Sequence, residues 1–184
     1  IGDYDCVYVR GSFRFTSLLR SVTSLIWDKS YMPIHPDAFV VGRDKLLTHL
    51  KLQTAGIPQP KTYLVAKPKI GKQVLKKMTY PVVMKLLSGT HGKGVMLADS
   101  RESASSMMDA LAALRQPFLI QEYIETEGTD IRVIVAGNEA IAWMRRIAEK
   151  GEKRANIHAG GRGEKVKLDE KFKTTAVQAA KAVG

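Results

Sequence analysis

Two periods in the spacing of hydrophobic and polar residues predict a mixture of strands and helices along the chain. Strands are predicted over residues 5–10, 62–65, 81–87, 95–97, 118–123, 130–135, 140–146 and 164–168. Apolar residues three and four positions apart predict helices over 16–27, 43–55, 72–78, 101–114 and 172–183. Residues 38–41 are apolar and strand-like, and Pro33 and Pro36 make them part of a connector. No strict strand–helix–strand rhythm runs through the chain, so the predicted class is α+β.

One predicted strand carries a lysine and leads into a glycine-rich loop. In the run 81–87, side chains alternate, so Val83, Lys85 and Leu87 share a face. A lysine in such a run must be buried, reach water or bind an anion. Glycines 89, 92 and 94 follow, where a backbone could close over a phosphate and offer its N–H groups.

The apolar run 95–97 then predicts a strand–loop–strand hairpin. The glycine spacing matches neither the dinucleotide-binding fingerprint nor the Walker loop, both of which open a helix. Its nearest mechanical parallel is the glycine-rich hairpin that covers ATP phosphates in kinases. A plain hairpin turn remains the alternative for the loop taken alone.

A second predicted hairpin, turning at Gly137-Asn138, places an acid and a base on one face. Asp130 and Arg132 alternate with apolar residues, so they point the same way. Arg145 and Arg146 lie on opposite faces of the partner strand, so only one of them can share a cleft with Arg132. A solvated cross-strand ion pair is the plain alternative.

The basic segment after this hairpin offers a further polar set. Arg154, Asn156 and His158 alternate within it, and an arginine–asparagine pair can hold a carboxylate or a transferring phosphoryl group. A solvated loop explains the same residues. His91 and His158 are too isolated to predict a metal site, and Cys6 has no partner for one.

The composition limits the partners and the location. There are 29 lysines and arginines against 18 aspartates and glutamates, a net charge of +11, which fits anionic partners. Aromatic residues make up only 7% and none lies in the basic segment 150–167, so nucleic-acid binding is not favoured. The single cysteine fits a reducing cytoplasm, and no apolar run is long enough to predict a membrane span. A start at Ile1 and an end within a helical pattern predict a fragment of a longer protein.

Taken together, these features resemble the ATP-grasp ligases, and among them the RimK-like glutamate ligases. The resemblance runs from about residue 37 to the end, in family order and with family-like spacing. It rests on the stretches Gly42–Lys45, Val83–Lys85, Gly89–Val95, Gln121–Ile124, Asp130–Arg132 and Arg154–His158.

The resemblance implies an ATP-grasp fold, in which ATP lies between two α+β lobes. Residues 1–36 would be the tail of a preceding α/β domain with its connector. Residues 37–120 would form the first lobe with the glycine-rich loop, and residues 121–184 the hinge and an incomplete second lobe.

The same resemblance implies roles for individual residues. The ATP site would comprise Lys45 and Lys85 at the phosphates, the loop residues Gly89, Thr90, His91, Gly92 and Gly94 over them, Glu122, Tyr123 and Ile124 at the adenine, and Asp130 near the ribose. Arg154 and Asn156 would lie near the phosphates and the acceptor carboxylate, and Arg132 would be a further cation of the cleft, so these three are the predicted catalytic residues.

Two departures from the family pattern stand out. His91 occupies a position where a glutamine is expected, which leaves phosphate binding by backbone N–H groups intact but could alter closure of the loop. The family's Mg²⁺ ligands, an aspartate and a later Glu-x-Asn, would lie beyond Gly184, so no metal ligand is predicted here and the 184-residue chain alone is expected to be inactive.

The activity implied is an ATP-dependent carboxylate–amine ligase, which forms an amide through an acylphosphate and adds an amino acid, with glutamate favoured, to a protein, carrier or coenzyme carboxylate. Three alternatives remain: a non-catalytic nucleotide-binding module of the same fold, a basic nucleic-acid-binding domain, and a related kinase or phosphotransferase. Relatives often assemble as homo-oligomers, and the residues that select the acceptor usually lie outside these stretches.

Overall fold

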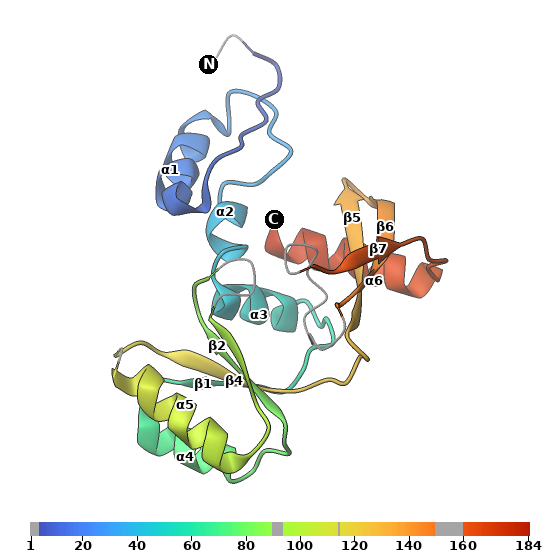
Figure 1. Cartoon of the computed structure of the whole chain (residues 1–184). Helices are drawn as coiled ribbons and strands as arrows, with labels where there is room; N and C mark the ends of the chain where they lie inside the picture. Colours follow the sequence, from blue (N-terminus) through green and yellow to red (C-terminus); the bar gives the residue numbers. More distant parts are fainter. Residues whose placement is uncertain (1–3, 90–93, 114, 150–159) are drawn as a thin grey trace. The chain divides into compact units, whose positions relative to one another are not determined.

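The computed structural model describes residues 4–89, 94–113, 115–149 and 160–184 (Figure 1). The chain divides into two compact units. The first unit contains residues 1–58, 133–143 and 167–184, and the second contains residues 59–132 and 144–166. The boundaries at residues 36 and 120 that the sequence predicts for the domains stay predictions.

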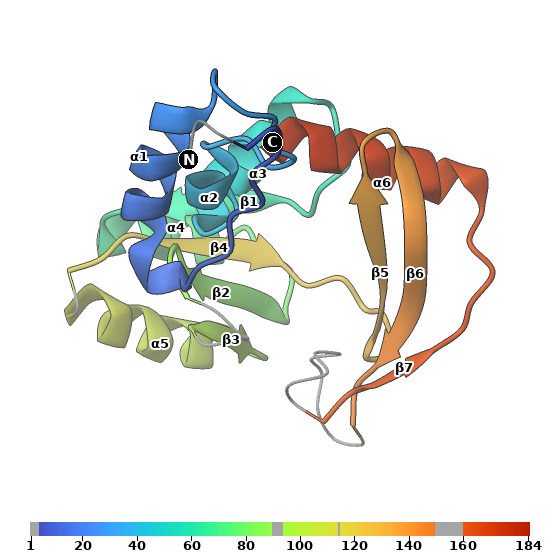
Figure 2. The same ribbon diagram turned by 90° about the horizontal axis from the view of Figure 1, so that it is seen from above.

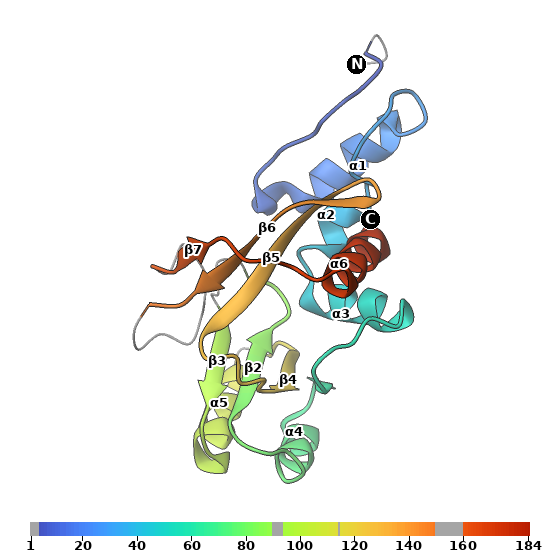
Figure 3. The ribbon, with the colours of Figure 1, turned by 90° about the vertical axis from the view of Figure 1, so that its right-hand side faces the viewer.

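The second unit is built on a four-stranded sheet within the described residues. Its order is β1-β4-β2-β3, and all neighbouring strands are antiparallel. Helices α4 and α5 lie side by side against one face of this sheet (Figures 1 and 3). The bounds are β1 Thr62–Val65, α4 Pro68–Leu75, β2 Val82–Leu86, β3 Val95–Ala98, α5 Arg101–Ala113 and β4 Phe118–Glu122.

The core of the second unit lies between this sheet and the two helices. Alternate residues of β2 and β4 point into it, so Val82, Met84, Phe118 and Ile120 are almost completely buried. Each helix contributes its apolar positions, including Leu75 of α4 and the residues Ala104, Met108 and Leu111 of α5. Because the core takes one face of each strand, the residues between these positions point to the opposite face.

The first unit contains helices α1, α2, α3 and α6, with 3₁₀ turn η1 ahead of α1. Asp44 caps α3, since its carboxylate accepts hydrogen bonds from the N–H groups of Leu46 and Leu47 at 2.8 and 3.0 Å. Helix α6 packs against α3. The bounds are η1 Phe13–Phe15, α1 Thr16–Ile26, α2 Ala38–Val41, α3 Lys45–Thr54 and α6 Glu170–Val183.

A long hairpin forms most of a second, three-stranded sheet among the described residues (Figure 2). Strands β5, Thr129–Ala136, and β6, Glu139–Ile147, turn at Gly137, whose φ of 57° lies in the left-handed region that favours glycine. The short β7, Arg162–Glu164, pairs antiparallel with the end of β6. The α+β class and the predicted hairpin are thus confirmed.

Some predicted elements are wrong or shifted. The predicted strand over residues 5–10 forms only a parallel bridge between Cys6 and Tyr31, because the described part of the chain offers it no neighbouring strand. Residues 38–41 form helix α2 instead of a strand, since a run of four apolar residues fits either period. Helix α4 begins earlier than predicted because Pro68 favours the first turn of a helix. The last strand is Arg162–Glu164, ahead of the predicted 164–168.

Within the described residues, no helix combines the length and the apolar character that crossing a membrane requires.

Candidate functional site

Lys85 projects from β2 on the face of the sheet opposite to α4 and α5. Its neighbour Met84 is completely buried in the core, so the alternation of the strand turns Lys85 the other way. Leu119 of β4 lies directly opposite Lys85 and is only 2% exposed, which gives the lysine stem an apolar neighbour. The lysine is therefore half-buried on the face predicted for it.

A hydrogen-bonded chain connects Lys85 to two neighbouring strands. The ammonium donates to Oε1 of Gln121 on β4, and Nε2 of Gln121 donates to Oγ1 of Thr62 on β1 at 2.7 Å. Thr62 Oγ1 in turn donates to the carbonyl oxygen of Pro60 at 2.8 Å. In register, Gln121 lies opposite Thr62 and diagonal to Lys85, a separation that long side chains span.

The ends of the glycine-rich loop are described, whereas Thr90, His91 and Gly92 lie outside the described residues. Gly89 and Gly94 have φ values of 146° and 75°, which residues with a side chain rarely adopt. The N–H of Leu86 donates to the carbonyl of Gly94 at 2.8 Å, and a Cβ added at Gly94 would come within 3.1 Å of the Leu86 side chain. The predicted strand–loop–strand arrangement is confirmed at both of its ends.

Three predicted adenine residues lie where β4 ends. Glu122 binds the start of β1, because its Oε1 accepts from the Lys61 N–H at 2.8 Å and its own N–H donates to the Lys61 carbonyl. Tyr123 is half-buried, and its pKa is raised by burial, with the nearby Glu125 carboxylate adding to the effect. Ile124 is 52% exposed and leaves an apolar surface beside the strand end.

Asp130 is held by Arg146, one strand away. The two side chains form a bidentate ion pair, with Nε–Oδ1 at 2.6 Å and Nη2–Oδ2 at 2.7 Å. These hydrogen bonds raise the pKa of Arg146, which is mostly buried. Only one of Arg145 and Arg146 can lie on the face of Arg132, and the ion pair shows which one. Arg146 shares the face of Asp130, and by alternation the exposed Arg132 lies on that face too. Arg145 points to the opposite face.

We expect Arg146→Met to lower the free energy of unfolding by about 1–2 kcal/mol, because it removes two charge-assisted hydrogen bonds while water still reaches part of Asp130. Chemical denaturation measures the change. The exposed Arg162, paired with Glu164, is the control, and Arg162→Met should change the stability by less than about 1 kcal/mol. Equal losses in the two variants would contradict a special role for the Asp130–Arg146 pair.

Lys45 is the first residue of α3 and belongs to the first unit. Burial lowers its pKa, and the neighbouring Asp44 carboxylate offsets part of that effect. A cation at the N-terminus of a helix is also disfavoured by the helix dipole. The charged form of Lys45 therefore lowers the stability of the folded protein. The charged form is also the one that could bind a phosphate.

This cost predicts a pH dependence of stability. The folded protein releases the Lys45 proton at a lower pH than the unfolded chain does, so the unfolded chain binds more protons in the pH window below 10.5. The contribution of this group to the free energy of unfolding therefore rises with pH in that window. We expect Lys45→Met to be more stable than the unmodified protein at neutral pH, with the difference shrinking as the pH rises through that window. Denaturation across pH measures it, and Lys51→Met controls for the loss of an exposed charge on the same helix.

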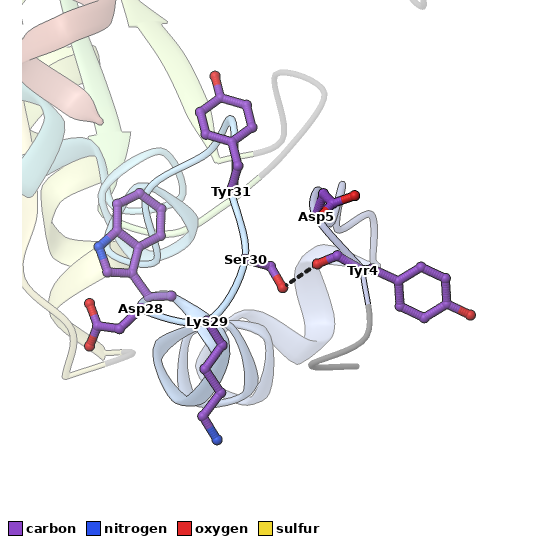
Figure 4. A pocket seen from close by; sticks show the side chains of 7 residues that line it. Tyr4, Asp5, Asp28, Lys29, Ser30 and Tyr31 are labelled. Carbon is purple, nitrogen blue, oxygen red and sulfur yellow. Dashed lines mark hydrogen bonds between the residues drawn. The ribbon is translucent and has the colours of Figure 1, made fainter.

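One cavity of about 530 Å³ is lined by Tyr4, Asp5, Trp27, Asp28, Lys29, Ser30 and Tyr31, and in it the Ser30 hydroxyl donates to the Tyr4 carbonyl at 2.6 Å (Figure 4). It combines two acids, a lysine and three aromatic rings with no convergent set of donors. Within the described residues, no group of three or more His, Cys, Asp or Glu side chains could hold a metal ion.

The structure thus brings together part of the predicted set. Lys85 lies on the same sheet as β4, which ends at Glu122 and is followed by Tyr123 and Ile124. Gly89 and Gly94 flank the loop that joins β2 and β3 of this sheet. Arg154 and Asn156 lie outside the described residues. The roles given to all these residues stay predictions.

Sequence reasoning assigned no role to three residues that the geometry brings forward: Gln121, Thr62 and Arg146. Gln121 stood within a recognised stretch, but its contact with Lys85 depends on which strands are neighbours. Arg146 was one of two open choices. For Gln121, the one signal in the sequence was a polar residue at the end of the otherwise apolar run 118–121.

Comparison with known proteins identifies the chain's relatives. The model of the RimK-like ATP-grasp domain matches residues 42–184. A probable alpha-L-glutamate ligase of Histophilus somni strain 2336 is 36% identical over 184 residues, which cover 99% of this chain and 62% of that protein. The chain therefore spans less than two thirds of the length of this relative.

Solved structures show the same fold. A RimK domain ATP-grasp protein of Sphaerobacter thermophilus superimposes with a TM-score of 0.71 at 19% identity, over 98% of this chain and 64% of that one. The D-alanine–D-alanine ligase of Bacillus anthracis, solved in complex with ATP, gives a TM-score of 0.69 at 14% identity, over 97% of this chain and 60% of that one. At such low identities these likenesses establish the fold alone, and the predicted ATP-grasp fold is confirmed.

Proposed function

The chain belongs to the RimK-like ATP-grasp family, and from this premise we propose that the protein containing it is an ATP-dependent carboxylate–amine ligase that adds L-glutamate to a carboxylate acceptor. The glutamate ligase name of the Histophilus somni relative supports the choice of amino acid. The observation that carries the proposal is Lys85, a half-buried cation on the sheet face that the core leaves free, in the strand that leads into the glycine-rich loop.

The residues of this chain would act by binding and by neutralising charge. A carboxylate oxygen attacks the γ-phosphorus of ATP, the bond to the β,γ-bridging oxygen breaks, and ADP leaves with that electron pair. The amine then attacks the acylphosphate carbon, phosphate departs, and the amine loses a proton. Lys85 would hold phosphate oxygens in a fixed place, where a cation away from bulk water interacts more strongly than in solution.

The glycine-rich hairpin and the end of β4 would hold the rest of the nucleotide. Gly89 and Gly94 have the backbone freedom that a loop closing over phosphates needs. At the end of β4, Tyr123 and the exposed Ile124 offer an aromatic and an aliphatic surface of the kind that a base can pack against. We assign Asp130, Arg132, Arg154 and Asn156 to the sugar, phosphate and acceptor on the basis of the family pattern.

Magnesium would neutralise the triphosphate, as is usual in phosphoryl transfer. The described residues of this chain do not fit such a site, because no cluster of acidic side chains is present among them. We therefore expect the metal ligands to lie outside the part of the protein described.

The test is amide formation by the protein that contains this chain. It is incubated with ATP, Mg²⁺, isotope-labelled glutamate and a cell extract, and the products are analysed by mass spectrometry. Labelled glutamate in amide linkage, with ADP and phosphate released, supports the proposal and identifies the acceptor. Binding of ATP with no turnover on any acceptor would instead indicate a nucleotide-binding module, and phosphate retained on a product would indicate a kinase.

A polynucleotide competition distinguishes the remaining alternative. The net charge of +11 is compatible with nucleic-acid binding, which would show a steep dependence on salt. We expect ATP to bind in the presence of excess polynucleotide, because the proposed site depends on particular residues of one sheet. Displacement of ATP by polynucleotide at physiological salt would argue for the nucleic-acid alternative.

A further inference from the structure

Three strands of the second unit contribute one side chain each to a line of hydrogen bonds on the sheet face opposite to α4 and α5. The line runs from Lys85 on β2 to Gln121 on β4, then to Thr62 on β1, and ends at the carbonyl of Pro60. All four residues belong to the same compact unit, and the strand register that aligns them is continuous.

The end of this line fixes its direction. A carbonyl oxygen can only accept, so the Thr62 hydroxyl, which lies 2.8 Å from it, donates its single proton to Pro60. The oxygen of Thr62 is then available only as an acceptor, and the Gln121 group that faces it at 2.7 Å must be the NH₂ end. The amide oxygen of Gln121 is therefore turned toward Lys85, where it accepts from the ammonium.

The same geometry suits a lysine that must meet an anion. An amide oxygen orients an ammonium without neutralising it. A carboxylate at the same place would form an ion pair and reduce the positive charge offered to a phosphate. The side-chain polarity along the line thus holds the lysine in place through a neutral partner.

We propose that Gln121 and Thr62 are positioning residues that hold the Lys85 ammonium in the orientation needed to bind the phosphates of ATP. The inference rests on the proposed function, and deepens it, because it concerns the same nucleotide site. Neither residue needs to touch the nucleotide. Their contribution reaches it through Lys85 alone.

Three substitutions of the protein that contains this chain test the line at separate points. Thr62→Val keeps the shape of the side chain but cannot accept from Gln121, and we expect ATP to bind about 3- to 10-fold more weakly. Thr62→Ser retains the hydroxyl and should restore affinity to within about twofold of the unmodified protein. Gln121→Glu pairs a carboxylate with Lys85, and we expect a weakening of about tenfold or more.

Two further measurements separate positioning from a merely structural role. Adenosine, which lacks phosphates, should bind all of these variants with unchanged affinity, whereas a damaged fold would weaken both ligands. In the background of Lys85→Met, adding Thr62→Val should cause no further loss of ATP affinity, because the second residue acts through the first. Calorimetric titration gives these affinities.

The outcomes keep the two proposals apart. If the unmodified protein fails to bind ATP, the proposed function fails. If Lys85→Met binds ATP normally, the assignment of Lys85 to the phosphates fails, and the positioning inference fails with it. If Lys85→Met weakens ATP binding but Thr62→Val and Gln121→Glu do not, the nucleotide site stands and the positioning inference is overturned. Losses from Thr62→Val and Lys85→Met that simply add would overturn it as well.

Discussion

Replacing Lys85 by alanine should lower amide formation by the protein that contains this chain about 100-fold or more, which corresponds to about 3 kcal/mol of transition-state stabilisation. The reason is that charge shifts among the phosphate oxygens as the γ-phosphoryl group is transferred, and a lysine already held in place needs no reorganisation to stabilise it. The rate is measured as glutamate-dependent release of ADP, at saturating and at limiting ATP.

The control for this variant is Lys76→Ala, which removes an exposed lysine at the end of α4 in the same unit. It changes the net charge equally, so a loss confined to Lys85→Ala cannot come from the overall field of the protein. The unfolding free energy of both variants should stay within about 1 kcal/mol of the unmodified protein. Unchanged amide formation in a folded Lys85→Ala protein would remove the assignment of this lysine to the phosphates.

The arrangement around Lys85 shows what a single sequence can predict. The run 81–87 alternates apolar and polar faces, and the strand returns through a local hairpin, so the side of the sheet that Lys85 takes follows from neighbouring residues alone. The burial of Val82 and Met84 agrees with that alternation. Local patterns of this kind were sufficient for most helices and strands of both units.

What the sequence did not predict depends on contacts between distant residues. Gln121 is 36 positions from Lys85, and the two meet only because β4, not β1, is the neighbour of β2. The choice between Arg145 and Arg146 likewise needed the register of β6 against β5. The prediction for the short apolar segment Ala38–Val41 was wrong for a different reason. Four residues are too few to distinguish a helical period from a strand period.

Ile120 and Gln121 occupy opposite faces of one strand, so stability and nucleotide binding can be separated by mutation. Ile120 is completely buried between β2 and β1, opposite Met84 and Tyr63, and packs in the core beneath α4 and α5. We expect Ile120→Ala to lower the free energy of unfolding by about 3–4 kcal/mol, because it loses the burial of three carbons and leaves a cavity. Leu64→Ala, at an apolar position of β1 that is 46% exposed, should cost less than about 1 kcal/mol.

The effect of ATP on the Ile120→Ala variant completes this argument. A ligand that binds only the folded state stabilises it by an amount set by its concentration and affinity. Since the Gln121 face remains intact in the folded molecules, saturating ATP should raise the unfolding free energy of the variant as much as that of the unmodified protein, as thermal denaturation with and without ATP can measure. In the contrary outcome, the variant loses this gain in stability from ATP and yet unfolds cooperatively. That result would mean that the core face of β4 and the face that carries Gln121 are coupled, so the alternation of the strand does not isolate the site from the packing beneath it.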